Sequence, residues 1–169
     1  DPHAHIRENL TDGVEGSVIY PSMGLNSFSI PAGDLVSAIF RGYNDWLADF
    51  CQPYPNQLKG IAMINEDDVK EAVIELERTA KMGLAGAMIT VQPTDRRYNN
   101  ADYEPLWAAA ADLEMPLSLH VGTMRWRPGV NATDLPDATA VVNGEIMVRN
   151  AIADIVLSGV FERHPKLRI

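Results

Sequence analysis

Histidine is the residue type in this sequence whose positions most directly suggest chemistry. A neutral imidazole ring binds divalent metals and can also move protons near neutral pH. His3 and His5 stand one residue apart at the start of the chain, and His120 closes the apolar segment PLSLH. The remaining histidine, His164, lies between a predicted helix and a predicted strand. The sequence therefore offers two places for a metal ligand, one near its start and one at His120.

His120 has the more favourable position of the two. A lone histidine on an apolar strand is usually a hydrogen-bonded core residue, but this one comes at the end of a strand predicted at 115–122. In a parallel barrel, the carboxyl ends of the strands carry the active site. His164 precedes a strand instead, so we expect it on the opposite surface of the barrel, without a catalytic role.

Further side chains at that edge are candidates for binding a small substrate. Tyr20 ends the apolar run SVIY, and Arg125 follows His120 in the segment HVGTMRWRPG. A guanidinium group can hold a substrate carboxylate through two parallel hydrogen bonds. The alternatives are packing for Tyr20 and solvation in a loop for Arg125 and Arg127. We predict that Tyr20 and Arg125 bind substrate, and Gln92, at the end of another predicted strand, is a further candidate.

The acidic run Glu66-Asp67-Asp68 is interpreted as helix capping and not as a carboxylate metal site. Asp68 and Glu71 form a D-x-x-E capping box ahead of an apolar periodic segment. Asp34 stands in the same way before an earlier periodic segment, and we expect it to cap that helix. The sequence thus assigns no catalytic carboxylate.

Predicted strands and helices alternate along the chain. Short apolar segments bounded by turn residues predict strands, and apolar positions at helical spacing predict the helices between them. The predicted strands are 16–22, 58–65, 85–91 and 115–122, with a further strand beginning at 166–169. The predicted helices are 34–50, 68–83, 102–113 and 138–165.

This alternation indicates βαβ units and a parallel sheet within a single domain, residues 1–169. A doubly wound sheet and a (β/α)8 TIM barrel both fit it. A dinucleotide-binding sheet would carry the pattern G-x-G-x-x-G after its first strand, and the segment YPSMGLNS lacks it. We therefore predict an α/β fold of the barrel type. Because a complete barrel takes about 250 residues, we expect a partial barrel, the central fragment of a longer domain.

Composition excludes several classes of partner. The chain has 169 residues and a formal net charge of −9, which argues against nucleic acids and anionic membranes. No apolar run approaches the roughly 20 residues of a membrane span. The single cysteine, Cys51, excludes an intrachain disulfide and fits a reducing compartment. We expect a cytoplasmic protein whose partner is a small-molecule substrate.

Several segments carry a resemblance to a known family. They are DPHAHIRENLTDGVEGSVIYPS, GLAGAMIT, YEPLWAAAADLEMPLSLHVGT and SGVFERHPKLRI. In this order, over essentially the whole chain, they resemble the amidohydrolase-2 family, which includes aminocarboxymuconate-semialdehyde decarboxylase and related decarboxylases and metal-dependent hydrolases. The resemblance implies that the chain holds strands 2 to 5 of the barrel and the start of strand 6.

The resemblance also distributes roles among the histidines. It places His120 at a metal-ligand position, with zinc as the expected metal and manganese as the alternative. It aligns the first segment with the helix before the second strand, so that His3 and His5 are solvated helix residues. Only about ten residues separate His5 from the next strand, the lower limit for a crossover, which agrees with that alignment. The family's other ligands and its catalytic histidine are expected outside these residues, so we expect the fragment alone to be inactive.

The resemblance leaves two reactions open. A hydrolase would use the metal to activate water for attack on an amide or ester, and a non-oxidative decarboxylase would use it to hold the substrate while CO2 departs. Either would act on a small carboxylated or aromatic-derived substrate. The alternative from another class is a non-catalytic remnant or binding module with no metal site. Open sheet edges promote association, so a homo-oligomer is also expected.

Overall fold

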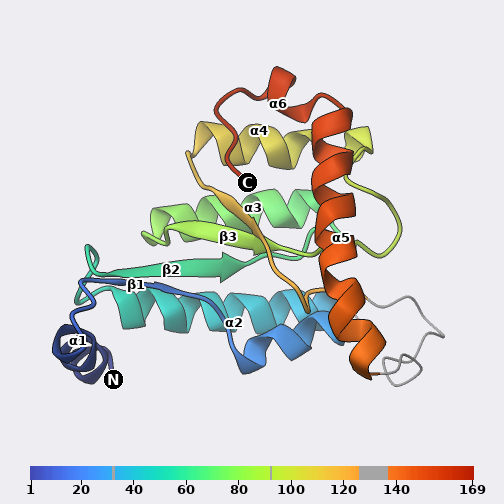
Figure 1. The fold of residues 1–169 in the computed structure, drawn as a ribbon. Helices are drawn as coiled ribbons and strands as arrows, with labels where there is room; N and C mark the ends of the chain where they lie inside the picture. Colours follow the sequence, from blue (N-terminus) through green and yellow to red (C-terminus); the bar gives the residue numbers. More distant parts are fainter. Residues whose placement is uncertain (32, 92, 126–136) are drawn as a thin grey trace.

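The computed structural model describes residues 1–31, 33–91, 93–125 and 137–169, with side chains from residue 145 onward in the last segment (Figure 1). The strands are β1 (Ser17–Ile19), β2 (Leu58–Met63), β3 (Gly86–Ile89) and β4 (Leu117–Leu119). The α-helices are α1 (Pro2–Thr11), α2 (Gly33–Cys51), α3 (Val69–Lys81), α4 (Glu104–Asp112), α5 (Asp137–Leu157) and α6 (Val160–Arg163). Short 3-10 helices, η1 (Met23–Ser29) and η2 (Ala101–Tyr103), lie in the loops after β1 and β3.

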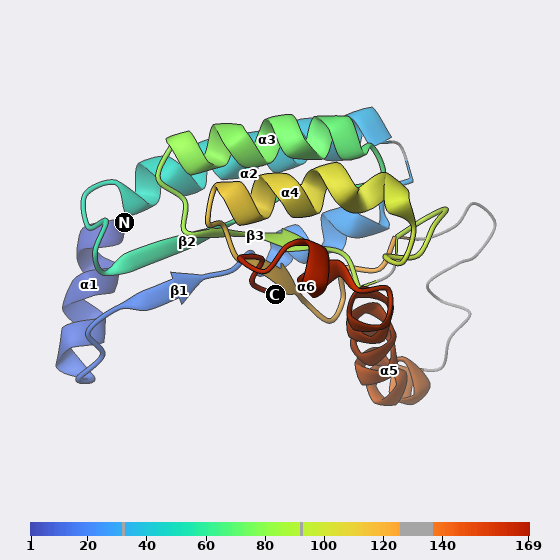
Figure 2. The same cartoon turned by 90° about the horizontal axis from the view of Figure 1, so that it is seen from above.

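Within the described residues, the strands form one parallel sheet in the order β1-β2-β3-β4. Ile19 lies opposite Gly60, for example, and Met88 lies opposite Ser118. The connecting helices α2, α3 and α4 run along one side of this sheet (Figure 2). Strand–helix–strand units therefore repeat along the chain, and the predicted α/β fold of a partial barrel is confirmed.

The apolar core has two parts because β2 and β3 are buried on both faces, as is usual for parallel strands. Ile64 and Ile89 belong to the larger part, together with Leu76 of α3 and Trp107 of α4. Side chains of neighbouring residues point to opposite faces. The smaller part accordingly contains Met63 and Met88, covered by Phe28 of η1 and by Val36 and Phe40 of α2.

The ends of the predicted helices move by one or two residues in the structure, and two of these helices differ in a further way. α2 begins at Gly33, so Asp34 lies in its first turn instead of capping it, where its charge still interacts favourably with the helix dipole. The predicted helix at 138–165 is divided into α5 and α6. Gly159 between them has a φ of +72°, the left-handed conformation that commonly ends a helix. None of the described helices is long and apolar enough to cross a membrane.

Apolar side chains remain exposed at the outer edges of the sheet and along α5. They include Val18, Val121, Ile152 and Leu157. Residues 166–169 form no strand, but the Leu117 amide donates to the carbonyl oxygen of Arg168 at 2.9 Å. The strand predicted to begin there is therefore not formed, and this segment contacts β4 through one backbone hydrogen bond.

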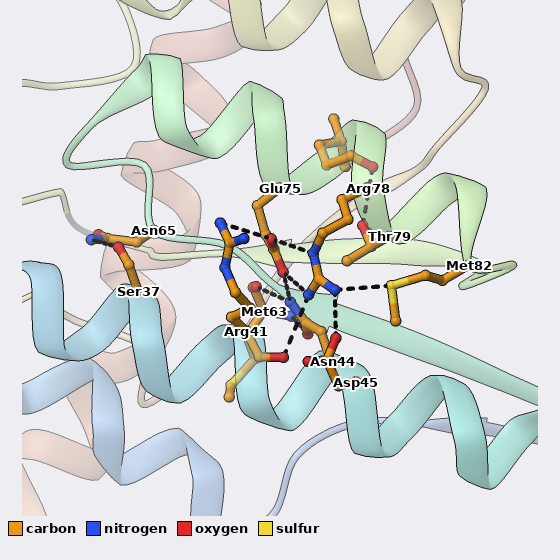
Figure 3. Close-up of polar contacts among 11 residues, drawn as sticks. Ser37, Arg41, Asn44, Asp45, Met63, Asn65, Glu75, Arg78, Thr79 and Met82 are labelled. Carbon is orange, nitrogen blue, oxygen red and sulfur yellow. Dashed lines mark hydrogen bonds and ion pairs between the residues drawn. The ribbon is translucent and has the colours of Figure 1, made fainter.

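Asn44 of α2 completes the edge of β2 (Figure 3). Consecutive residues of a parallel strand direct their backbone groups to opposite neighbours. Since the Ile64 amide donates to the Met88 carbonyl on β3, the amide and carbonyl of Met63 face the β1 side. β1 has already ended there, at Ile19. Asn44 Oδ1 accepts from the Met63 amide at 2.8 Å, and its Nδ2 donates to the Met63 carbonyl at 2.9 Å. A side-chain amide thus replaces the missing strand.

Glu75 of α3 also binds the Asn44 side chain. Its Oε1 accepts from Asn44 Nδ2 at 2.8 Å. Arg78 donates to Oε1 at 2.7 Å and to Oε2 at 2.8 Å, and Arg41 lies 3.6 Å from Oε2. The buried carboxylate therefore faces two guanidinium groups, and it ties α3 to α2 and β2 (Figure 3).

Candidate active site at the carboxyl ends of the strands

The loops that follow the strands meet at one edge of the sheet. Tyr20, Thr90 and His120 come directly after β1, β3 and β4, and Glu66 lies in the loop after β2. In parallel α/β folds, ligands bind at the carboxyl ends of the strands. This edge is therefore the candidate active site.

Tyr20 and His120 come together although they follow the two outer strands. Their ring centroids are 5.7 Å apart, and the Tyr20 hydroxyl lies 2.8 Å from Ser118 Oγ. In a flat sheet, strands three positions apart would be separated by about 14 Å, more than these two side chains span. The contact shows that the sheet curls toward a barrel, with Tyr20 and His120 on its inner side.

The His120 ring is held in one tautomer. Its Nδ1 lies 2.6 Å from the carbonyl oxygen of Val121. Because a carbonyl oxygen can only accept, Nδ1 must carry the hydrogen, and in the neutral ring the lone pair is then on Nε2. Nε2 has no hydrogen-bond partner among the described residues. Metal-bound histidines commonly have this arrangement, in which one nitrogen donates to an oxygen and the other faces the ion.

The described residues do not assemble a complete metal site. Nowhere among them do three or more histidine, cysteine or carboxylate side chains converge. Structural zinc sites use four protein ligands and catalytic sites usually three. His120 fits one such ligand, so a metal bound there would need further ligands from outside these residues.

His3 and His5 lie at the other end of β1. They belong to α1, the helix predicted from the first segment, and Asp1 caps this helix by accepting from the His3 amide. His5 Nε2 is 3.2 Å from Oγ of Ser17, the first residue of β1. Tyr20, which contacts His120, comes after the last residue of β1. The histidines thus occupy opposite edges of the sheet, as expected for a helix that precedes the strand.

His164 makes a structural contact away from this site. Its Nε2 lies 2.8 Å from Glu104 Oε2 in the first turn of α4, and Arg163 pairs with the other oxygen of the same carboxylate. Hydrogen bonds from both residues lower the pKa of Glu104. His164 therefore joins the last described helix to α4.

Arg125 is buried, so its alternative interpretation as a solvated loop residue is wrong. Its Nε and Nη2 both lie 2.8 Å from Asp67 Oδ2, and its Nη1 donates to the carbonyl oxygens of Phe28 and Ile30 at 2.8 and 2.7 Å. These bonds join the loops after β1, β2 and β4. Binding of a substrate carboxylate by Arg125 stays a prediction. Arg127 and Gln92 lie outside the described residues.

Glu66 is the residue of this edge that sequence reasoning missed. The capping interpretation is confirmed for Asp68, which accepts from the amides of Lys70 and Glu71, but Glu66 is 1% exposed. Its Oε1 contacts the Thr90 amide and the Tyr98 hydroxyl, and its Oε2 has no partner among the described residues. Burial, reinforced by the charge of Asp67, raises the pKa of Glu66 to about 7 against the opposing effect of its hydrogen bonds.

A pocket of about 340 Å³ opens beside Tyr20, between β4 and α5. Its walls are mostly apolar, with Leu119, Ile152 and Phe161 among them, and Tyr20 and Ser118 contribute hydroxyl groups. A volume of this order holds a small organic molecule.

Comparison with known proteins establishes the family. The model of the amidohydrolase family matches residues 2–169, and the chain belongs to this family. Decarboxylase orsB of Emericella nidulans is 25% identical over 151 residues, which cover 82% of this chain and 45% of that protein. Gamma-resorcylate decarboxylase of Polaromonas sp. is 27% identical over 147 residues, 76% of this chain and 42% of that protein. The chain spans less than half the length of these curated relatives.

A solved structure supports the fold. The 5-carboxyvanillate decarboxylase of Novosphingobium aromaticivorans, complexed with manganese and 4-hydroxy-3-methoxy-5-nitrobenzoic acid, aligns with a TM-score of 0.76 at 20% identity. The alignment covers 97% of this chain and 47% of that one. At this identity the likeness concerns the fold, and it agrees with the partial barrel described above.

Proposed function

We propose that the protein, in its complete form, is a metal-dependent carboxy-lyase that removes CO2 from a small aromatic carboxylate. The single observation that carries the proposal is the His120 ring, whose Nε2 has no partner among the described residues and lies beside Tyr20 at the carboxyl ends of the strands. The choice of decarboxylation over hydrolysis follows the two decarboxylase relatives.

In this proposal His120 contributes one metal ligand through Nε2. Imidazole suits both zinc and manganese, and manganese is the metal in the 5-carboxyvanillate decarboxylase complex. The metal would supply positive charge that orients a carboxylate or phenolate group of the substrate. Tyr20, with its ring against His120, would contact the aromatic part of the substrate, and the neighbouring apolar pocket would limit access of water.

The proposal is tested on the complete protein with His120→Ala. We expect the bound manganese or zinc, measured by plasma mass spectrometry, and decarboxylation of 2,6-dihydroxybenzoate and related acids to fall together, by about 100-fold or more, since few ligands hold the ion. His5→Ala is the matched control and should retain both, because His5 lies at the other edge of the sheet.

The possible outcomes separate the candidate functions. Wild-type metal content in His120→Ala would overturn the ligand assignment. If His120→Ala loses its metal and the wild-type protein releases an amine or alcohol from amide or ester substrates, the protein is a hydrolase. A protein that binds aromatic carboxylates, holds no metal and turns none of them over would be a binding module.

A further inference from the structure

The buried carboxyl group of Glu66 is joined to the backbone of His120 through two threonines. The Thr90 amide donates to Glu66 Oε1 at 2.7 Å, and the Thr90 hydroxyl donates to the carbonyl oxygen of Thr123. Thr123 Oγ1 in turn donates to the carbonyl oxygen of His120 at 2.6 Å and accepts from the Val91 amide at 3.0 Å. Both threonines are fully buried. The loops after β2, β3 and β4 thus share one hydrogen-bonded chain that starts at Glu66.

The single hydrogen of the Tyr98 hydroxyl has two acceptors, the Thr90 carbonyl and Glu66. The Tyr98 hydroxyl oxygen lies 2.6 Å from the Thr90 carbonyl oxygen and 3.0 Å from Glu66 Oε1. A phenol has one hydrogen to donate, and the carbonyl group has none. The Thr90 carbonyl and Glu66 Oε1 therefore compete for the one hydrogen that Tyr98 donates. A neutral carboxyl group is a weaker acceptor than a carboxylate, so it leaves this hydrogen on the shorter contact to Thr90.

The charges around Glu66 favour its neutral form. None of the described arginines, lysines or histidines forms an ion pair with it. In the described part of the chain, the ionisable groups that face it are the Asp67 carboxylate and the hydroxyls of Tyr98 and Tyr103, each of which is neutral or negative. Arg125 is bound to Asp67, and Arg96 is bound to Asp102. An ionised Glu66 would therefore be a buried charge with no counter-ion among the residues that the structure describes, which is costly.

We propose that Glu66 is a positioning residue that, as the neutral acid, holds the loop carrying His120, and that its ionisation loosens this loop. An ionised Glu66 would draw the Tyr98 hydrogen away from the Thr90 carbonyl and strain the contact between Thr90 and Thr123. Only the consequence for metal binding rests on the proposed function. The protonation of Glu66 and its link to Thr123 can be measured without it.

The first experiment follows Glu66 by carbon NMR in the protein labelled with 13C at the glutamate carboxyl groups. We expect its resonance to move near pH 7, while exposed glutamates move near pH 4.3, and the Thr123 amide resonance to move with the Glu66 midpoint. Glu66→Gln should abolish both changes, and the exposed Glu77→Gln should leave both in place. Titration of Glu66 together with the exposed glutamates, or a Thr123 amide that does not respond, would overturn the proposal.

The second experiment measures manganese affinity of the complete protein at pH 6 and pH 8. Deprotonation of imidazole strengthens metal binding as pH rises, and loosening of the loop would oppose this in the wild type only. We expect equal affinities for wild type and Glu66→Gln at pH 6 and about tenfold tighter binding by the variant at pH 8. A ratio that is the same at both pH values would overturn the positioning role. If the NMR result holds but His120→Ala keeps its metal, the metal-ligand assignment fails and the Glu66 link remains.

Discussion

Glu75, on helix α3, and Glu66, in the loop after β2, are both buried carboxyl groups. They differ in the charges that surround them. Glu75 accepts hydrogen bonds from Arg78 and Asn44 and also pairs with Arg41. Glu66 forms no ion pair with any described residue, and its Oε2 has no hydrogen-bond partner there. The first group joins two helices and a strand, whereas the second lies among the loops of the candidate active site.

The difference shows how one residue type serves two purposes. A buried charge is stable when cations and hydrogen-bond donors compensate it, and Glu75 therefore makes a permanent connection. A buried carboxyl group without a cation is stable mainly in its neutral form. Glu66 can therefore respond to pH within the range in which enzymes work.

Asn44→Ala should have the largest effect, because it removes three buried hydrogen bonds at once. The Met63 amide, the Met63 carbonyl and Glu75 would each lose a partner. At about 1–3 kcal/mol for each unpaired group, we expect the free energy of unfolding to fall by about 4 kcal/mol. Denaturation with urea measures this loss. Asp49→Ala, at an exposed position of the same helix, is the control, and an equally small loss in both variants would refute the role of Asn44.

Glu66→Gln should be next, with an effect that depends on pH. The pKa of Glu66 is raised from its ordinary value of 4.5 to about 7, so the folded protein binds the proton more tightly than the unfolded chain. Wild-type stability should therefore decline as pH rises from about 4.5 to about 7. The variant lacks this decline and should match the wild type at pH 4 and exceed it by about 3 kcal/mol at pH 8. Parallel stability profiles for the two proteins would contradict the neutral acid.

Glu75→Gln makes the comparison sharper, since the same substitution should act in the opposite direction. Arg78 and Arg41 would lose their carboxylate, and we expect a loss of about 2 kcal/mol. The loss should be similar at pH 6 and pH 8, because the arginines stay charged throughout. A stabilised Glu75→Gln variant at pH 8, measured in the same urea series, would show that the two glutamates do not differ as described.

Asp45→Ala should have the smallest effect. Asp45 also pairs with Arg78, but its side chain is 56% exposed, and exposed ion pairs contribute about 0.2–1 kcal/mol. We expect a change in melting temperature close to the error of the measurement, and one that disappears in high salt. A loss as large as that of Glu75→Gln would mean that Arg78 depends on Asp45 for its position.

The helices, the strands and the places of the histidines in the fold could be predicted from the sequence, because each depends on the pattern of neighbouring residues. Apolar periodicity identified the strands and helices, and the position of His120 at the end of PLSLH gave its place at the carboxyl edge. Asn44 also carried a usable signal. It stands at helical spacing between Phe40 and Leu47 on the buried face of α2, where a polar residue requires a partner.

The contacts of Glu66 and Arg125 could not be predicted in this way, because their partners are distant in the chain. Glu66 looks like part of an acidic capping run, and only the fold brings Tyr98 and Thr90 to it. Arg125 meets Asp67 and the carbonyl of Phe28 across three loops. In an isolated segment both side chains would be exposed to water. Their burial comes from the packing of distant loops, which the local sequence pattern does not indicate.

The replacement of a strand by Asn44 has a consequence for local opening of the protein. The Met63 amide hydrogen is protected from exchange with solvent by a side chain of α2, whereas the next amide, of Ile64, is protected by the Met88 carbonyl on β3. Movement of α2 away from β2 exposes the first hydrogen and leaves the second in place. Two adjacent amides therefore report two different motions, the detachment of a helix and the separation of two strands.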